Sequence, residues 1–340
     1  GMHIMIREGT GARNLAALLP IVTGQSSRRL MWCTDDRHPH DLIEEGHIDS
    51  IVAVAVQGGV DLVTAIRMAT LNPAERFGLT HLGAVAPGRQ ADLVVFSDPT
   101  CLRAEAVYVR GVLIAREGRL VEGTRKPSPP EAPPTMNINL QALDFSLAAG
   151  GKQVRVIDLV PRQILTRQSI EAAPVEGMRL VSDTGRDLLK IAVVERHTGS
   201  GRIGLGVVRG FGLRRGALAS SVAHDSHNIL VVGATDADMR AAVEAVVAMG
   251  GGLAVAAGGR ILASLPLPVA GLMSLEPVQA VSAAMDRLVQ AARELGSPLK
   301  DPFMTLSFLA LPVIPELRIT DRGLVDVTQF RHVGPFSDAS

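Results

Sequence analysis

The first 78 residues alternate between short apolar strands and amphipathic helices, and this alternation limits the folds open to the chain. Strands are predicted at 3–8 and 28–34, with helical spacing over 13–19 between them. Apolar residues then recur with a period of about 3.6 residues in two helices that Gly58 and Gly59 separate. This order predicts an α/β architecture, either part of a (β/α)8 barrel or a doubly wound sheet.

Acidic residues follow both predicted strands. Glu8 follows the first strand, and Asp35 and Asp36 follow the second. In (β/α)8 barrels the catalytic groups lie just past the C-terminal ends of the strands, so Glu8 and Asp35 are expected to open onto one face. An Asp-Asp pair after a strand is also typical of a turn or a helix cap. The residues alone leave both interpretations open.

The pattern changes twice beyond residue 78. Period-two apolar positions with Gly and Pro at the turns predict a small β module, and a stretch rich in Pro and charge at 122–137 predicts an extended connector. Beyond it the chain is again mixed. Strands are expected at about 189–195, 203–208, 217–222, 228–233 and 252–265, and helices at about 236–249 and 276–295, the first capped by Thr235 or Asp236.

Composition limits the classes of partner and the compartment. Lys plus Arg and Asp plus Glu number 34 each, which gives no electrostatic footprint for nucleic acid or for a membrane surface. No apolar run reaches the roughly 18 residues of a membrane span. Two cysteines, Cys33 and Cys101, cannot build a disulfide framework, which favours a reducing compartment and hence the cytoplasm. We therefore expect small-molecule or protein partners. The strand at the very start suggests a fragment.

Four longer motifs point to one family. They are "MIREGT" at 5–10, "CTDDRHPHDLIEEGHID" at 33–49, "MATLNPAERFGLTHLGAVAPGRQADLVVF" at 68–96 and "GALASSVAHDSHNILVVG" at 216–233. The third resembles the end of the barrel and the returning β-sandwich of the amidohydrolase superfamily. Together the motifs resemble the bacterial adenine deaminases.

This resemblance implies a domain organisation. Residues 1–78 would be the last strands and helices of the metal-dependent hydrolase barrel, 79–125 part of the β-sandwich, 126–150 a connector and 151–335 the family's C-terminal α+β domain. The family's His-x-His pair and its other His and Glu metal ligands belong to an N-terminal half that this sequence lacks. We therefore expect the isolated chain to be incomplete for activity.

The resemblance also implies a reaction, the hydrolytic deamination of adenine to hypoxanthine and ammonia in purine salvage. It implies a binuclear manganese or iron centre, with the remaining ligands outside this sequence, and a homodimer. Asp35 would be a metal ligand and proton shuttle, because a divalent metal lowers the pKa of its bound water and a carboxylate can pass the proton to departing ammonia. The alternatives are another amidohydrolase acting on a cyclic amide, and a non-catalytic purine-binding or assembly module.

Further candidates surround Asp35. Asp36 could begin a helix or hydrogen-bond a metal ligand. His38 is a candidate because it lies three residues beyond Asp35, whereas His40 and His47 are expected in loops or at the surface, since the spacing matches no compact zinc pattern.

Arg7 and Glu8 also leave two interpretations open. They could belong to an ion pair that closes the barrel interior. Alternatively, Glu8 could hydrogen-bond purine nitrogens or orient a ligand.

A second polar cluster comprises His224, Asp225 and His227, between two apolar strands. Such groups are costly to bury unless they are paired. The cluster is either a structural hydrogen-bonded network or a wall of the active site supplied by the second domain, and the motif favours the wall. The glycine-rich segment 197–216 is expected to be a hairpin, because a strand rather than a helix follows its glycines.

Overall fold

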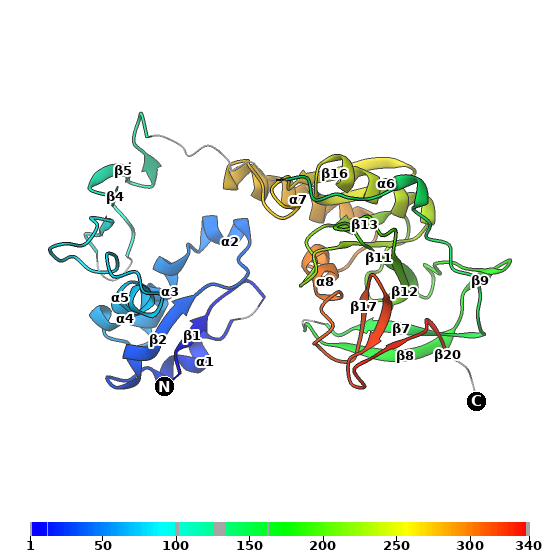
Figure 1. Cartoon of the computed structure of the whole chain (residues 1–340), viewed down its shortest axis with the longest axis horizontal. Helices are drawn as coiled ribbons and strands as arrows, with labels where there is room; N and C mark the ends of the chain where they lie inside the picture. The colour runs from blue at the N-terminus through cyan, green and yellow to red at the C-terminus, as the bar shows by residue number, and fades with distance from the viewer. Residues whose placement is uncertain (1, 12, 99–101, 125–132, 162, 338–340) are drawn as a thin grey trace. The chain divides into compact units, whose positions relative to one another are not determined.

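The computed structural model describes residues 2–11, 13–98, 102–124, 133–161 and 163–337 (Figure 1). The chain divides into two compact units, Gly1–Ser128 and Pro129–Ser340, which are described separately. Cys101 and residues 125–132, which belong to the predicted connector region, lie outside the described residues. No helix in the described ranges is long and apolar enough to cross a membrane.

The first unit begins with a pair of parallel strands. β1 (Ile4–Arg7) lies beside β2 (Leu30–Cys33) in a register that aligns Arg7 with Cys33. The buried Trp32 side chain packs among the helices, and its Nε1 donates a hydrogen bond of 2.9 Å to the Ala65 carbonyl oxygen. The helices are α1 (Leu15–Leu18), α2 (Pro39–Glu44), α3 (Ile48–Gln57), α4 (Leu62–Ala69) and α5 (Leu71–Arg76), with 3-10 turns η1 (Leu19–Ile21) and η2 (Ser26–Arg29).

The predicted strands and helices of residues 3–78 are thus confirmed, including the break between α3 and α4. Parallel β1 and β2 are shared by a barrel and a doubly wound sheet, so the barrel stays a prediction. Asn72 fastens α5 to this pair, because its buried side-chain amide donates to the carbonyl oxygens of Ser27 (2.6 Å) and Leu30 (2.7 Å).

The rest of the first unit is the predicted small β module. Its four antiparallel strands lie in the order β3-β4-β5-β6, and tight turns join β4 to β5 and β5 to β6. Arg110-Gly111 and Glu117-Gly118 form two-residue loops with positive φ at every position, the geometry that matches the twist of a hairpin. The strands are β3 (Leu93–Val95), β4 (Ala106–Val109), β5 (Val112–Arg116) and β6 (Arg119–Leu120).

The second unit is built on a nine-stranded sheet in the order β16-β15-β13-β14-β11-β12-β7-β20, with β8 also paired to β7. Neighbours are antiparallel except β12 and β7. The strands are β7 (Gln153–Leu159), β8 (Thr166–Ala172), β11 (Leu189–Val194), β12 (Ile203–Arg209), β13 (Ala217–Ser220), β14 (Ile229–Gly233), β15 (Gly252–Ala257), β16 (Arg260–Pro266) and β20 (Phe336–Ser337).

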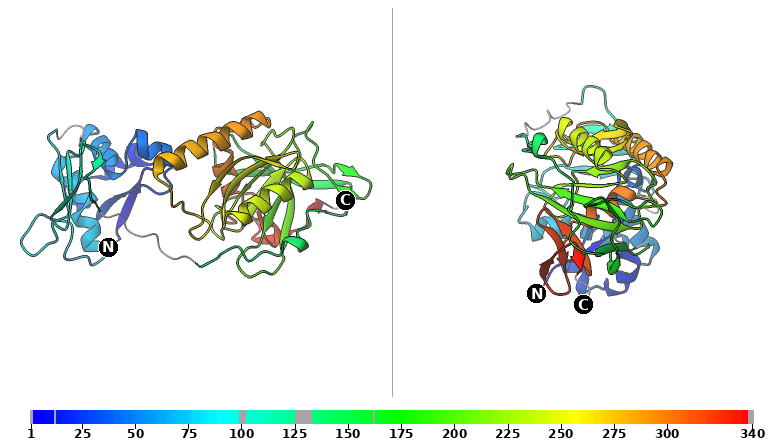
Figure 2. Two further views of the ribbon diagram at one scale, coloured as in Figure 1. Left: turned by 90° about the horizontal axis from the view of Figure 1, so that it is seen from above. Right: turned by 90° about the vertical axis from the view of Figure 1, so that its right-hand side faces the viewer.

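Helices cover both faces of this sheet (Figure 2). Ile191 and Val193 of β11 join the core beneath α7 (Val278–Glu294) and α8 (Pro302–Phe308). Ala192 and Val194 join the core beneath α6 (Asp236–Ala248). Because alternate side chains of a strand point to opposite faces, β11 is buried on both faces and central to the unit; its one charged residue, Lys190, pairs with Asp236.

A second, three-stranded sheet packs on β12 because two glycines leave room for it. A Cβ at Gly204 would lie 1.9 Å from the Thr320 carbonyl oxygen, and one at Gly206 would lie 2.8 Å from a Leu324 methyl carbon. The sheet comprises β17 (Leu317–Thr320), β18 (Gly323–Asp326) and β19 (Arg331–Val333). A short hairpin of β9 (Val175–Glu176) and β10 (Arg179–Leu180) and the 3-10 turn η3 (Leu140–Ala142) complete the second unit.

The predictions for this unit are mostly confirmed. The four strands expected between 189 and 233 are β11 to β14, and both expected helices are present, α6 with the Thr235 hydroxyl accepting from the Asp238 amide at 3.2 Å. The single strand expected at 252–265 is wrong. Gly258 and Gly259, with φ of 58° and 71°, form a two-residue turn that divides it into β15 and β16.

Candidate functional site

The parallel register of β1 and β2 brings Glu8 and Asp35 to the same end of the strand pair. The Glu8 amide donates to the Cys33 carbonyl oxygen at 3.0 Å, which continues the ladder one residue beyond the strands. Gly9 follows, where a Cβ would lie 2.6 Å from the carbonyl oxygen of Thr34. Glycine therefore lets the two loops pass closely enough to place the acidic residues together.

The Asp35 carboxylate is held by two neighbours. Its Oδ2 accepts from the Arg7 guanidinium in an ion pair, and its Oδ1 accepts from the Asp36 amide at 2.9 Å. The backbone of Asp35 lies in the left-handed region, with φ of 60°. Arg7 is oriented in turn by Asn14, whose Oδ1 accepts from the Arg7 Nε at 3.0 Å. The side chain of Asp35 is 37% exposed, so solvent reaches this ion pair.

Glu8 has a local structural task. Its Oε2 accepts a hydrogen bond of 3.0 Å from the amide of Leu15, the first residue of α1. Of the two interpretations left open for Arg7 and Glu8, an ion pair is present, but it joins Arg7 to Asp35, while Glu8 satisfies an amide that has no partner within its helix.

Asp36 and His38 are tied to the loop that follows β1 through their backbones. The Asp36 carbonyl oxygen accepts from the Thr10 amide at 2.8 Å, and the His38 amide donates to the Thr10 hydroxyl at 2.9 Å. His38 directly precedes α2. The two strand-end loops thus form one hydrogen-bonded unit around Thr10.

Arg37 is a structural cation of this region that sequence reasoning missed. Its side chain is only 3% exposed, with Nε 2.9 Å from the Gly46 carbonyl oxygen and Nη2 2.9 Å from a carboxylate oxygen of Glu45. Its Nη1 donates to the Glu8 carbonyl oxygen at 3.3 Å. The only available signal was its place directly after the Asp-Asp pair.

The residues present do not by themselves fit the expected two-metal centre. Divalent metals in proteins take about four to eight ligands. Within the described ranges, no group of three or more His, Cys, Asp or Glu side chains is arranged to hold a metal. Asp35 can therefore supply one carboxylate at most, and the chemistry that follows is confined to this chain's own residues.

The second candidate set lies in the loop between β13 and β14. The His227 Nδ1 accepts from the Ala223 amide at 3.1 Å, which folds the ring back over its own loop. The His224 ring lies 4.7 Å from that of Phe308 in α8 and 5.8 Å from that of His227. Burial lowers the pKa of His227, and nearby His224 and Arg196 lower it further. Asp225 is exposed.

Arg196, which sequence reasoning also missed, anchors this loop. Its side chain is buried, with Nη1 and Nη2 each 3.0 Å from a backbone carbonyl oxygen, those of Thr135 and Ala270. Its Nε donates to the carbonyl oxygen of His227. Burial lowers the pKa of the guanidinium. The neighbouring His197 donates from Nε2 to the Ser226 carbonyl oxygen at 2.7 Å, so two consecutive residues hold one loop.

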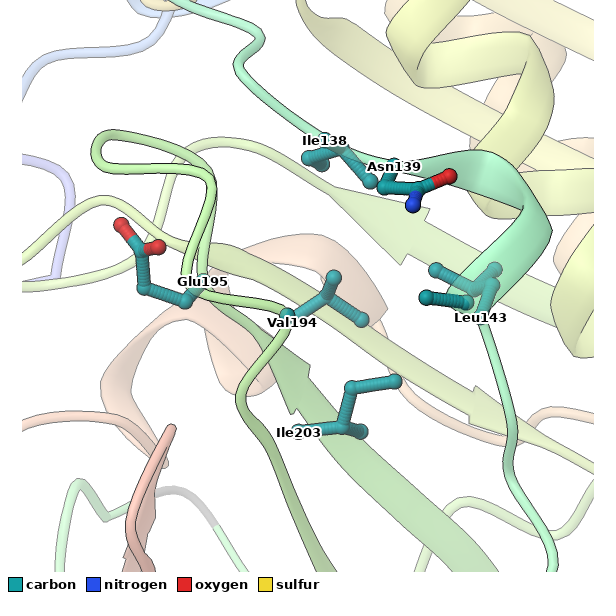
Figure 3. A pocket seen from close by; sticks show the side chains of 8 residues that line it. Ile138, Asn139, Leu143, Val194, Glu195 and Ile203 are labelled. Atoms are coloured by element: carbon teal, nitrogen blue, oxygen red, sulfur yellow. The ribbon is translucent and has the colours of Figure 1, made fainter.

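Glu195 organises the turn between β11 and β12, which confirms the hairpin predicted for the glycine-rich segment. Burial alone raises the pKa of its carboxyl, but hydrogen bonds from Ser200 and Thr198 outweigh that effect and lower the pKa to about 2. The cavity of about 10 Å³ beside it, lined in part by Ile138 and Leu143 (Figure 3), has room for about one water molecule. It is too small for a purine.

Two family models match the chain. Residues 3–124 match the amidohydrolase family, and residues 163–331 match the adenine deaminase C-terminal domain. A solved amidohydrolase from Thermotoga maritima aligns with 30% of this chain and 26% of its own, at 25% identity. Its TM-score of 0.24 supports no conclusion about the fold. Most of the first unit is thus similar to the amidohydrolase family, through the match over residues 3–124.

The curated relatives narrow the assignment. Proteins named adenine deaminase from Desulfatibacillum aliphaticivorans and Methanothrix thermoacetophila are 56% and 49% identical, each over 99% of this chain. One from Nitratidesulfovibrio vulgaris is 48% identical over 97%. The predicted resemblance to adenine deaminases is confirmed. The chain spans 59%, 59% and 58% of the lengths of these three relatives.

Proposed function

We propose that the whole protein is an adenine deaminase that hydrolyses adenine to hypoxanthine and ammonia. The observation that carries this proposal is the identity of 56% over 99% of the chain to a protein of that name. The family match over residues 163–331 supports the same substrate. Because the chain spans about three fifths of its relatives, the activity is proposed for the complete polypeptide.

Asp35 is the proposed catalytic carboxylate. Replacement of the amino group at C6 requires one group that removes a proton from the attacking water and returns a proton to the departing ammonia. A carboxylate can do both in turn. Asp35 sits at the strand ends in a fixed orientation, set by Arg7 and the Asp36 amide, and it is open to solvent. Arg7 is proposed to orient this carboxylate, and Asp36 and His38 to shape the loop around it.

Several finer features belong to the same proposal. A binuclear manganese or iron centre with most ligands outside this sequence and a homodimer rest on the resemblance alone. The barrel that would include β1 and β2 is supported also by the strand–helix order, and a cytoplasmic location by the two cysteines. Glu8 is proposed to orient a ligand through the loop that it stabilises. His224, Asp225 and His227 are proposed to contribute to binding of the purine.

The test uses the full-length protein with adenine, measuring ammonia release together with metal content. Asp35→Asn keeps the shape but removes the base, and we expect turnover to fall by about 10²-fold or more. Asp286→Asn, at an exposed position of α7, is the matched control and should leave turnover unchanged. Comparable rates for Asp35→Asn and the parent protein would reject the assigned role.

Two rivals predict other results in the same assay. A cyclic-amide hydrolase would open a hydantoin or dihydroorotate ring and release no ammonia from adenine. A non-catalytic module would bind adenine without turnover, even with manganese or iron added.

A further inference from the structure

Three hydrogen bonds from Arg196 and His197 hold the loop that carries His227. Arg196 donates from Nε to the His227 carbonyl oxygen, and His197 donates from Nε2 to the carbonyl oxygen of Ser226. The Asn228 Oδ1 accepts from the Arg196 amide at 3.2 Å. The backbone on both sides of the His227 side chain is therefore tied to the end of β11, which is buried in the core.

The protonation of His227 follows from its partner. A backbone N–H is always a donor, so the Ala223 amide requires an unprotonated Nδ1 on the ring that it contacts. A neutral imidazole then carries its proton on Nε2. The setting favours the neutral ring, because burial, with nearby His224 and Arg196, lowers the pKa of His227, and the opposing effect of exposed Asp225 is smaller. No hydrogen bond to the His227 Nε2 is found among the described residues.

We propose that His227 presents Nε2–H as a neutral hydrogen-bond donor to a ring nitrogen of the purine, and that Arg196 and His197 are positioning residues that aim it. This inference rests on the proposed function. Neutral adenine carries unprotonated ring nitrogens, which accept hydrogen bonds and cannot donate them. A fixed neutral donor matches such an atom. Because its Nδ1 is occupied and its Nε2 is protonated, His227 is neither a metal ligand nor a general base in this state.

A pair of amide variants separates this role from a purely structural one. Glutamine can place an amide NH₂ near the position of Nε2, so His227→Gln keeps the proposed donor. Asparagine places its oxygen near Nδ1, so His227→Asn keeps the acceptor for the Ala223 amide and loses the donor. If His227 has only a structural role, His227→Asn should retain activity toward adenine and His227→Gln should lose it. If His227 donates to the purine, His227→Gln should retain activity and His227→Asn should lose it.

We expect His227→Asn to lower kcat/KM for adenine in the full-length protein by about 10- to 100-fold, the loss typical of one missing hydrogen bond to substrate. His227→Gln should stay within about threefold of the parent protein. Equal loss in both variants, or better rescue by Asn, would overturn the donor role. If the parent protein releases no ammonia from adenine, the proposed function itself has failed.

The tautomer and the positioning role are tested separately on the 340-residue chain. Long-range proton–nitrogen NMR of histidine-labelled protein should show His227 as the Nε2–H tautomer near neutral pH, its signal identified by its absence from His227→Gln. A proton on Nδ1 would overturn the inference whatever the activity. Arg196→Met should shift or broaden this signal. If that variant does not fold, exposed His197→Asn tests the same anchor, and an unchanged signal would refute the positioning role.

Discussion

Replacing Glu195 with glutamine removes the charge at the centre of the β11–β12 turn while keeping its shape. The carboxylate accepts from the hydroxyls of Ser200 (2.7 Å) and Thr198 (2.8 Å), and from the amides of His197 (2.6 Å), Thr198 (2.8 Å) and Ser200 (3.1 Å). A glutamine offers one acceptor oxygen and turns an NH₂ group toward the remaining donors. The variant should therefore loosen the turn and lower the free energy of unfolding of the second unit.

The size of the effect follows from the pKa of Glu195. Folding lowers it from 4.5 to about 2, and each pKa unit corresponds to about 1.4 kcal/mol, so the charged form contributes up to about 3 kcal/mol. A lowered carboxyl pKa gives stability that is present above pH 4.5 and is lost as the pH falls toward 2. About 1.4 kcal/mol should be gone at pH 3.5.

Urea unfolding at pH 7 and pH 3.5 measures this difference. Far-UV circular dichroism reports both units, and fluorescence of Trp32, the single tryptophan, identifies the transition of the first unit. Glu195→Gln should be less stable than the parent chain at pH 7, and the gap should narrow at pH 3.5. Glu244→Gln, a half-exposed control paired with Arg240 at 3.3 Å, should cost below about 0.5 kcal/mol. A gap that stays constant with pH would refute the role of the charge.

Three further substitutions test other contacts. Gly9→Ala places a Cβ against a carbonyl oxygen of the loop after β2 and should reduce ammonia release by the full-length protein, whereas Gly11→Ala, with open space around it, should not. Arg318→Met leaves buried carbonyl oxygens without their donor and should cost about 3 kcal/mol in urea unfolding, whereas exposed Arg322→Met should be neutral. Gly204→Ala forces β17 away from β12 and should cost about 1–3 kcal/mol, which equal urea midpoints would contradict.

The strands that sequence reasoning found are those with apolar residues on both faces. β11 and β14 are buried at every position; β14 is a continuous apolar run, and β11 is apolar except at Lys190. β7 and β8 were not predicted, because charged residues interrupt their apolar positions: Arg155 and Asp158 in β7, and Arg167 and Glu171 in β8. These charges meet across the sheet, where Arg209 contacts Asp158 and Glu171 at 2.7 Å and 2.6 Å. A pattern within one strand does not reveal a partner 38 or 51 residues away.

The candidate site was predictable to different extents. The shared end of β1 and β2 followed from strand order, and family motifs singled out Asp35 and the loop with His227. The supporting arginines did not follow, because Arg196 and Arg37 make their key contacts with carbonyl oxygens of the backbone. Every residue has such an oxygen, so no side-chain motif marks the partner of a buried arginine.

Main-chain anchoring of Arg196 has a consequence for how this unit can diverge. The guanidinium contacts Thr135 and Ala270 through their carbonyl oxygens, so substitutions there can alter size or polarity without removing the anchor. Arg196 itself has no equivalent replacement, since lysine offers one point of donation where the guanidinium offers a planar fork. Substitutions at Thr135 and Ala270 should therefore be tolerated as long as Arg196 is retained, and they should require no compensating substitution elsewhere in the chain.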